Sequence, residues 1–113
     1  MVLPNGESFH PLQQMPTEIE IRRSHLPNKK YNAVVDGKRT VPFGQKGAAD
    51  FTTHRDEVRK ERYLKRHKAN ENWSDPATAG FYSRWLTWEK PTIREAAANV
   101  NRKFKNVHVK LKI

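Results

Sequence analysis

The segment that decides the fold reads Tyr31-Asn-Ala-Val-Val-Asp-Gly-Lys-Arg-Thr-Val-Pro-Phe43. Its centre, Asp36-Gly37, is a strong signal for a two-residue type I′ turn, and β-branched residues lie on both sides of it. The segment therefore predicts a β-hairpin over residues 31–43. Because Pro42 has no backbone N–H to donate to a neighbouring strand, we expect the second strand to lie at the edge of a sheet.

The length of the turn decides which side chains of the hairpin share a face. A two-residue loop places Val35 opposite Lys38 and Val34 opposite Arg39, and the pairing continues in the same way away from the turn. In that register, Val34 lies on the same side as Val41 and Phe43. Tyr31, Ala33 and Val35 lie on the other side.

Polar and apolar residues also alternate near both ends of the chain, which is the period of a half-buried strand. The two segments are residues 17–22 and, more clearly, residues 107–113. If the two strands pair within the chain, acidic residues of the first face lysines of the second: Glu18, Glu20, Lys110 and Lys112. If they do not, each can add to the sheet edge of another molecule. The sequence leaves both alternatives open.

A highly charged helix is predicted after the hairpin, over about residues 53–69. Thr53 and Asp56 resemble a capping box, with Asp in the place of the usual Glu. Few positions in this segment are apolar, so most of the helix surface must be in contact with water.

Two further helices with apolar faces are predicted before the last strand. Residues 76–88 follow a capping and proline signal, and residues 92–104 follow a full capping box formed by Thr92 and Glu95. A chain of 113 residues must build its core largely from aromatic side chains, each of which buries about 150–250 Å². We therefore assign to the core, rather than to stacking on nucleic-acid bases, the group Trp73, Phe81, Tyr82, Trp85 and Trp88.

Together these elements predict an α+β fold with one small domain. We expect an extended N-terminal arm over residues 1–28, whose prolines favour extended backbone, and a single domain over residues 29–113. The domain comprises the hairpin, three helices on an aromatic core and a C-terminal strand. The arm is expected to dock on neighbouring subunits through its isolated apolar side chains, which are Phe9, Leu12, Ile19 and Ile21.

The charge of the chain points to an acidic partner. There are 22 Lys and Arg against 12 Asp and Glu, which gives a net charge of +10 and an isoelectric point near 10.2. Residues 1–28 hold only two of these basic residues, so the positive surplus lies in the predicted domain. Such a field favours binding to polyanions.

Two groups of basic residues are candidates for that binding. On the charged helix, arginines recur every three or four residues and share one face, which suits a phosphate backbone; the alternative is a solvated face with intrahelical Glu–Arg pairs. In the C-terminal group, the alternative role of lysine is to protect an exposed strand edge. The candidate residues are Arg55, Arg59, Lys60, Arg62, Lys65, Arg66, Lys68, Arg102, Lys103, Lys105, Lys110 and Lys112.

Several classes of protein receive no support from the sequence. There is no cysteine, no apolar run of about 18 residues, no signal-peptide pattern at the N-terminus and no phosphate-binding glycine loop of the Gly-Lys-Ser/Thr kind. The five histidines are scattered, and the hairpin supplies none, so a metal-dependent His–Asn–His nuclease is a remote alternative. We expect no catalytic residue, cofactor, metal ion, membrane span or small-molecule substrate.

Four stretches together resemble a known family. They are the hairpin and its continuation to His54, Arg59-Lys-Glu-Arg-Tyr-Leu-Lys-Arg-His67, Asn70-Glu-Asn-Trp73, and Ala79-Gly-Phe-Tyr-Ser-Arg-Trp-Leu-Thr-Trp88. They are similar to small basic proteins of unknown function encoded by large nucleocytoplasmic DNA viruses and some phages. The resemblance covers about residues 30–104 and implies a viral source, but no functional residue.

The expected function is therefore that of a non-enzymatic, minor component of a viral particle, located in the virion or inside the host cell. Its arm and terminal strands would contact other virion proteins, and its basic face would meet genome or acidic protein. The alternative is a nucleic-acid-binding protein that contacts DNA or RNA phosphates without sequence preference. Either hypothesis requires the guanidinium groups between residues 55 and 66 to be free of internal ion pairs.

Overall fold

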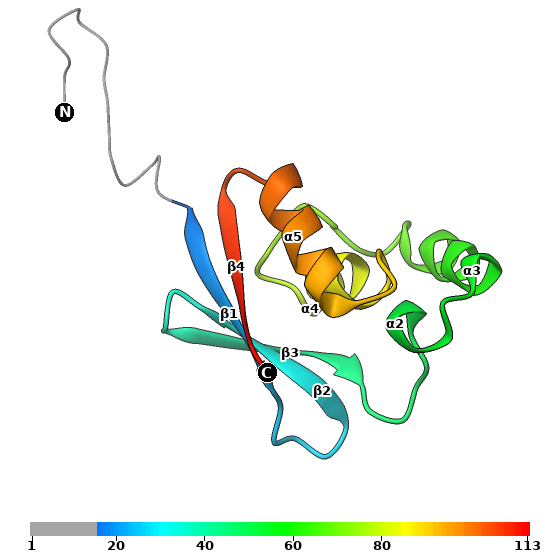
Figure 1. Ribbon diagram of the computed structural model, residues 1–113, viewed down its shortest axis with the longest axis horizontal. Helices are drawn as coiled ribbons and strands as arrows, with labels where there is room; N and C mark the ends of the chain where they lie inside the picture. Colours follow the sequence, from blue (N-terminus) through cyan, green and yellow to red (C-terminus); the bar gives the residue numbers. More distant parts are fainter. Residues whose placement is uncertain (1–15) are drawn as a thin grey trace, which may run out of the picture.

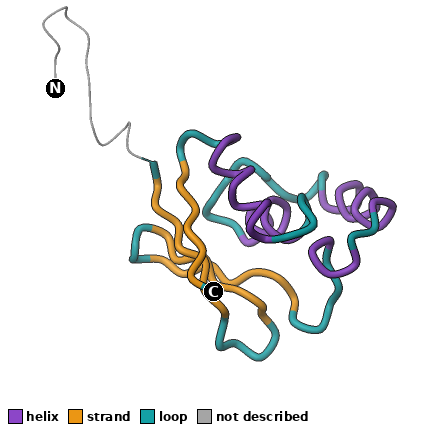
Figure 2. Tube along the Cα trace, in the orientation of Figure 1, coloured by secondary structure: helices purple, strands orange, loops and turns teal. Residues whose placement is uncertain are grey.

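The computed structural model describes residues 16–113, which form a four-stranded sheet with helices packed on one of its faces (Figure 1). In space the strand order is β3-β2-β1-β4. The strands are β1 (Thr17–Arg23), β2 (Lys29–Val35), β3 (Arg39–Gln45) and β4 (Val107–Lys112). The helices of residues 16–113 lie between β3 and β4 in the chain, which therefore crosses from one sheet edge to the other through the helical layer (Figure 2).

The predicted α+β class, the hairpin, the aromatic core and the C-terminal strand are confirmed. β1, β2 and β3 are joined by antiparallel pairing, whereas β4 runs parallel to β1. β3 lies at the sheet edge, as the proline at its centre predicts. The helical elements are α2 (Phe51–His54), α3 (Glu57–His67), α4 (Ala79–Tyr82), the π-helical turn η1 (Ser83–Thr87) and α5 (Ile93–Lys103).

The predicted arm over residues 1–28 is wrong for residues 17–23, because these residues form β1 in the interior of the sheet. β1 pairs with β2 on one side and with β4 on the other. Ile19 and Ile21 are only 1% and 0% exposed, so neither can dock on another subunit. The other predicted docking residues, Phe9 and Leu12, lie outside the described residues.

The register of the hairpin differs by one residue from the prediction. Val35 pairs with Arg39 rather than Lys38, although Asp36 and Gly37 have the positive φ values, 51° and 69°, that a type I′ turn needs. Lys38 is an additional residue in the loop, and a slip of one residue turns every side chain of the following strand to the other face. Val41 and Phe43 consequently face the core opposite Ala33 and Tyr31, with Val34 on the outer face.

The pairing of β1 with β4 shows that the two terminal strands meet within the chain. Glu20 pairs with Lys110 as predicted for acids facing lysines, but Glu18 pairs with His108, whose Nδ1 lies 2.7 Å from the Glu18 carboxylate. The free edge of β4 is also partly occupied, because the side chain of Asn101 on α5 accepts a hydrogen bond from the Val109 N–H and donates one to its carbonyl. The part of the β4 edge left for another molecule is therefore short.

The predicted helix over residues 53–69 is two helices. Arg55 adopts a left-handed conformation (φ 54°) and ends α2. Asp56 then caps α3, since its Oδ1 accepts hydrogen bonds from the N–H groups of Val58 and Arg59 at 2.9 and 3.3 Å. Thr53 is therefore not the N-cap, and the predicted capping box is wrong: Asp56 is the cap itself rather than its partner.

The two helices predicted on the aromatic core are both present. The first starts later than predicted, at Ala79, because Thr78 is its N-cap, and it widens to a π-helical turn over its last residues. The second is capped as predicted, with Thr92 Oγ1 accepting from the Glu95 N–H at 3.1 Å. The local capping signal was therefore reliable where a complete capping box was present.

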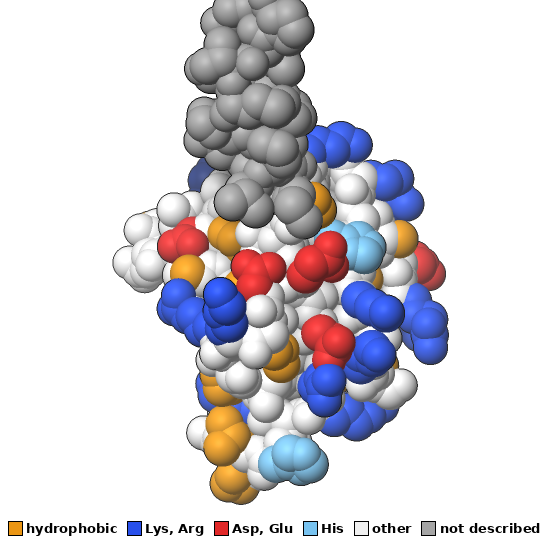
Figure 3. All heavy atoms as spheres, turned by 90° about the vertical axis from the view of Figure 1, so that its left-hand side faces the viewer, with side chains coloured by type: hydrophobic (Ala, Val, Ile, Leu, Met, Phe, Trp, Pro, Cys, Tyr) orange, Lys and Arg blue, Asp and Glu red, His pale blue; other side chains and the backbone are white. Residues whose placement is uncertain are grey.

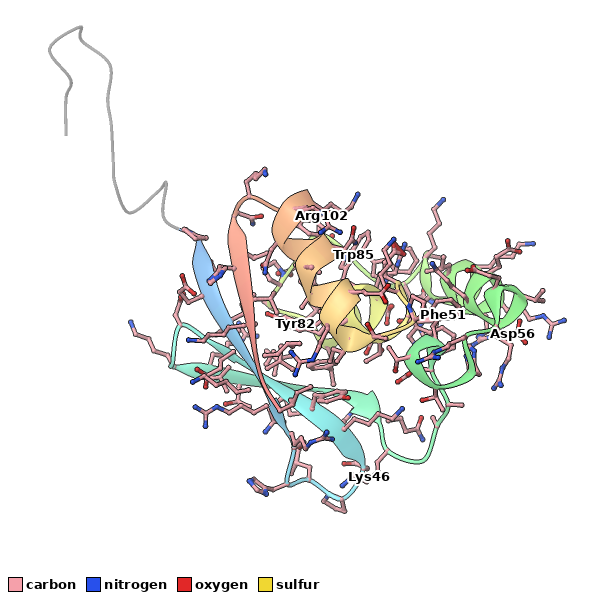
Figure 4. The ribbon with its side chains drawn as sticks, in the orientation of Figure 1. Lys46, Phe51, Asp56, Tyr82, Trp85 and Arg102 are labelled. Atoms are coloured by element: carbon pink, nitrogen blue, oxygen red, sulfur yellow. The ribbon has the colours of Figure 1, made fainter. Side chains whose placement is uncertain are left out.

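The core lies between the sheet and the layer formed by α4, η1 and α5 (Figure 4). Phe43 and Tyr82 are fully buried, with ring centroids 5.4 Å apart, and Trp85 donates a hydrogen bond from Nε1 to the Trp73 carbonyl at 2.7 Å. Each fully buried large apolar side chain contributes about 1.5–3 kcal/mol to stability. The aromatic group is thus structural, although Trp73 and Trp88 remain partly exposed.

Candidate anion-binding site

A cleft of about 570 Å³ lies between α3, the ends of β2 and β3, and the α4–η1 segment. Its walls come from segments that are far apart in the sequence, so no single motif marks it. The basic residues that line the cleft are Lys29, Lys30, Arg59, Arg62, Arg66 and His67.

The position of α3 on the protein directs three arginines into this cleft. Tyr63 is the buried residue of the helix, and its ring packs edge-on against Trp88 at a centroid distance of 4.2 Å. Residues three or four positions from Tyr63 lie on the same side of the helix. Arg59 and Arg66 have this spacing from Tyr63, and Arg62 lies three residues from Arg59 and four from Arg66. We call the three arginines, all of which line the cleft, the arginine stripe: Arg59, Arg62 and Arg66.

The arginine stripe is not neutralised within the protein. None of the ion pairs among residues 16–113 involves these three arginines or Arg55, and all four side chains are exposed. Glu57 and Glu61, which were the candidates for intrahelical pairing, take no part in those ion pairs either. The condition for binding an external anion is therefore met by the arginines.

Lys60, predicted on the same binding face, points into the protein instead. Its Nζ donates a hydrogen bond to the Glu89 carbonyl at 2.8 Å and lies 3.4 Å from the Glu89 carboxylate. The same Nζ lies 5.0 Å from the centre of the Phe51 ring. Lys60 thus fixes α3 to the rest of the domain, and its assignment to the binding face is corrected.

Glu89 receives the charge of both Lys60 and Arg84. Burial alone would raise the pKa of Glu89, but the hydrogen bond and charge of Arg84, 2.8 Å away, and the charge of Lys60 together hold the pKa below its ordinary value. The Arg84 guanidinium also lies over the Trp85 ring at 4.1 Å. This group is an internal network beside the cleft rather than part of its open surface.

On the opposite wall of the cleft, Lys30 is already used by Asp50, whereas its neighbour Lys29 is not. Lys30 Nζ donates to Asp50 Oδ2 and to the Ala48 carbonyl, both at 2.7 Å. Asp50 is 6% exposed and also accepts from the Thr52 hydroxyl at 2.5 Å. Sequence reasoning missed this pair because its partners are separated by two strands and a loop.

The carboxylate of Glu71 lines the same cleft, as does that of Asp50. Its Oε1 accepts from Trp73 Nε1 at 3.0 Å, and its Oε2 lies 3.3 Å from His67 Nδ1. Gly80 leaves room for it, since a Cβ at position 80 would lie 2.9 Å from the Glu71 carboxyl carbon. Burial, with the charge of Glu71, raises the pKa of Tyr63, so the Tyr63 hydroxyl stays neutral and adds no further negative charge to the cleft.

The C-terminal basic residues are not brought to the cleft. Arg102 and Lys103 lie in the last turn of α5, well away from Asp56 at the start of α3 (Figure 4). Lys110 and Lys112 lie on exposed positions of β4. On the side of the molecule opposite α3, Lys and Arg side chains are interspersed with Asp and Glu (Figure 3). Lys105 is exposed in the loop before β4, and Lys65 and Lys68 lie outside the cleft lining.

Within residues 16–113, no group of three or more His, Asp and Glu side chains is placed to hold a metal ion. No helix in this part of the chain is long and apolar enough to cross a membrane.

Comparison with known proteins finds similarity to one family and no activity. Neither a curated protein nor a solved structure matches the chain. Residues 19–67, which run from β1 to the end of α3 and include the whole arginine stripe, match a family of unknown function (DUF5754). This part of the chain is therefore similar to a family of unknown function.

Proposed function

We propose that this protein is a non-enzymatic binding protein that holds nucleic acid through its phosphates at the arginine stripe. The observation that carries the proposal is that Arg59, Arg62 and Arg66 line one cleft and take no part in the internal ion pairs of residues 16–113. The N–H groups of a guanidinium lie in one plane and match the spacing of two phosphate oxygens. Because phosphates are the same at every nucleotide, such contacts do not depend on the base sequence.

The arrangement of the acids supports a polyanion rather than a random basic surface. Three acidic residues near the cleft or α3 are already engaged: Asp50 by Lys30, Glu89 by Lys60 and Arg84, and Asp56 by the N-terminus of α3. Their negative charge is therefore partly offset by partners inside the protein. Glu57 and Glu61 on α3 take no part in the ion pairs of residues 16–113. The stripe retains its positive charge toward the solvent.

The test is the salt dependence of binding to a labelled duplex and to a labelled single strand, measured by fluorescence anisotropy. Each phosphate contact adds about −0.9 to the slope of log K against log salt for a duplex. Changing Arg59, Arg62 and Arg66 to Gln should weaken binding and reduce the size of that slope by about 2–3.

A matched control removes the same charge elsewhere. Arg102→Gln, Lys105→Gln and Lys112→Gln together lower the net charge equally, but lie outside the cleft. The control should retain most of the slope. If both triple variants lose binding equally, only net charge matters and the stripe is not the site; if the unchanged protein binds neither nucleic acid at low salt, the proposed function is wrong.

We also propose a setting, which rests on the resemblance to viral proteins. In a viral particle or inside the host cell, the stripe would face packaged genome or an acidic virion protein, and the chain would be a minor structural component. Its presence in purified particles at a fixed ratio to the main shell protein tests this setting. Absence from such particles refutes it and leaves the binding activity to be judged separately.

A further inference from the structure

The cleft beside the arginine stripe holds the Glu71 carboxylate as well as positive charge. Arg59 and His67 are eight residues apart on α3, which corresponds to about 12 Å along a helix. Glu71 follows His67 in the chain, and its Oε2 lies 3.3 Å from His67 Nδ1, so the carboxylate lies at the C-terminal end of α3. A ligand that fits this cleft must offer an anion to the arginines and hydrogen-bond donors to Glu71.

Glu71 is held in the cleft by its surroundings. The Trp73 indole donates to Oε1, the His67 ring lies beside Oε2, and Gly80 provides space that any side chain would fill. An ionised carboxylate has about four lone-pair positions. With one used by Trp73 and one by His67, the carboxylate retains the capacity to accept from a ligand.

The cleft also offers an aromatic surface. Trp88 lines the cleft and is partly exposed. Its ring packs against the rings of Tyr63 and His54, and the His54 and Trp88 ring centroids are 5.2 Å apart. A base can stack on such a ring, whatever its identity. The volume of about 570 Å³ lies within the range of about 300–1,000 Å³ for small-molecule sites.

We infer that this cleft binds one nucleotide unit. The phosphate is held by the arginine stripe with Lys29, the ring lies against Trp88, and sugar hydroxyl or base amino groups donate to Glu71. The inference rests on the proposed function, because the stripe supplies the charge for both. The unit is either a free nucleotide or one residue of a single strand; in a duplex the base is paired and stacked, and must be extruded before it can enter a pocket.

The first experiment separates a nucleotide site from a simple phosphate site. Calorimetric titrations use the four ribonucleoside 5′-monophosphates, the matching nucleosides and inorganic phosphate on the unchanged protein and on Glu71→Gln. We expect a monophosphate to bind more tightly than inorganic phosphate, and Glu71→Gln to weaken the monophosphate about tenfold while inorganic phosphate binds as well or better. If Glu71→Gln tightens both ligands, Glu71 merely repels anions and the inference is wrong.

The second experiment identifies the source of the nucleotide and separates the two proposals. A short single strand and a blunt duplex compete with the bound monophosphate, and Lys110→Gln, outside the cleft, serves as the control variant. Displacement by the single strand but not by the duplex supports a strand unit; displacement by neither supports a free nucleotide. Nucleic-acid binding that depends on the stripe, without monophosphate binding at millimolar concentration, overturns this inference alone. If the protein binds neither nucleic acid nor a monophosphate, both the proposed function and this inference are wrong.

Discussion

Replacing Lys30 by Met should destabilise the protein far more than the same change at Lys29. Lys30 Nζ is the counter-ion of the buried Asp50 carboxylate, at 2.7 Å, whereas Lys29 takes part in none of the ion pairs of residues 16–113. Met keeps the apolar stem of lysine and removes only the charge and the donors. The two variants therefore have the same composition and the same net charge, and differ only in whether Asp50 loses its partner.

The magnitude follows from burial. Breaking a buried ion pair by removing one partner costs about 3–5 kcal/mol, and we take about 3 kcal/mol because the Lys30 side chain is still 22% exposed. For a total stability of about 5–15 kcal/mol this is a large loss. In urea unfolding, an m value of about 1.5 kcal/mol per M converts it to a midpoint lower by about 2 M.

A double-mutant cycle completes the assay. Asp50→Asn removes the buried charge and leaves Oδ1 to accept from Thr52, so adding it to Lys30→Met should recover about 1 kcal/mol or more. Equal midpoints for Lys30→Met and Lys29→Met, or an additive double variant, would refute the reasoning. Either result would mean that water, rather than Lys30, satisfies Asp50.

Three further predictions follow from the same structure. Asp56→Ala should lower the free energy of unfolding by about 1 kcal/mol, because α3 loses the side chain that caps its first N–H groups; urea unfolding measures this. Glu89→Gln should destabilise the protein at neutral pH, because the ionised Glu89 carboxylate is stabilised by Arg84 in the folded state. Since Arg84 lowers the pKa of Glu89 in the folded protein, this stabilisation is lost only when Glu89 is protonated. The difference in unfolding free energy between the variant and the unchanged protein should therefore shrink as the pH falls below 4.5, the ordinary pKa of the side chain. Gly80→Ala should change stability by less than about 1 kcal/mol, since the helix gain from alanine offsets the displacement of Glu71; the indole N–H signals in an NMR spectrum should nevertheless shift.

Each of these predictions has its own contrary outcome. A loss well below half of the expected value for Asp56→Ala would mean that water caps α3 as well as the carboxylate does. A pH-independent effect at Glu89 would show that shape rather than charge matters there. At Gly80, a large loss of stability with unchanged indole signals would show that the backbone, not the carboxylate of Glu71, gives way.

Local signals in the sequence identified most helices and strands, but not the register of the hairpin or the break between α2 and α3. The complete capping box of Thr92 and Glu95 located α5, and Asp36-Gly37 located the hairpin turn. The extra loop residue Lys38 shifted the register, since turn chemistry alone does not count the residues that pair. The break at Arg55 was missed, because a left-handed arginine has no sequence signature comparable to glycine.

The candidate site was only half visible in the sequence. The spacing of Arg59, Arg62 and Arg66 predicted a shared face, because helical period is a local property. The other wall of the cleft could not be predicted, since it depends on how β2, β3 and α4 pack against α3. Nor could the inward turn of Lys60, which is set by Glu89 on a distant segment.

The parallel pairing of β1 with β4 has a consequence for how the protein is made. The paired residues Glu18 and His108 are 90 positions apart, so a ribosome completes the first strand long before the last one emerges. Until then β1 has an open edge, with its isoleucines not yet covered by the finished layers. The nascent chain therefore exposes this edge to aggregation until β4 has emerged and paired with β1.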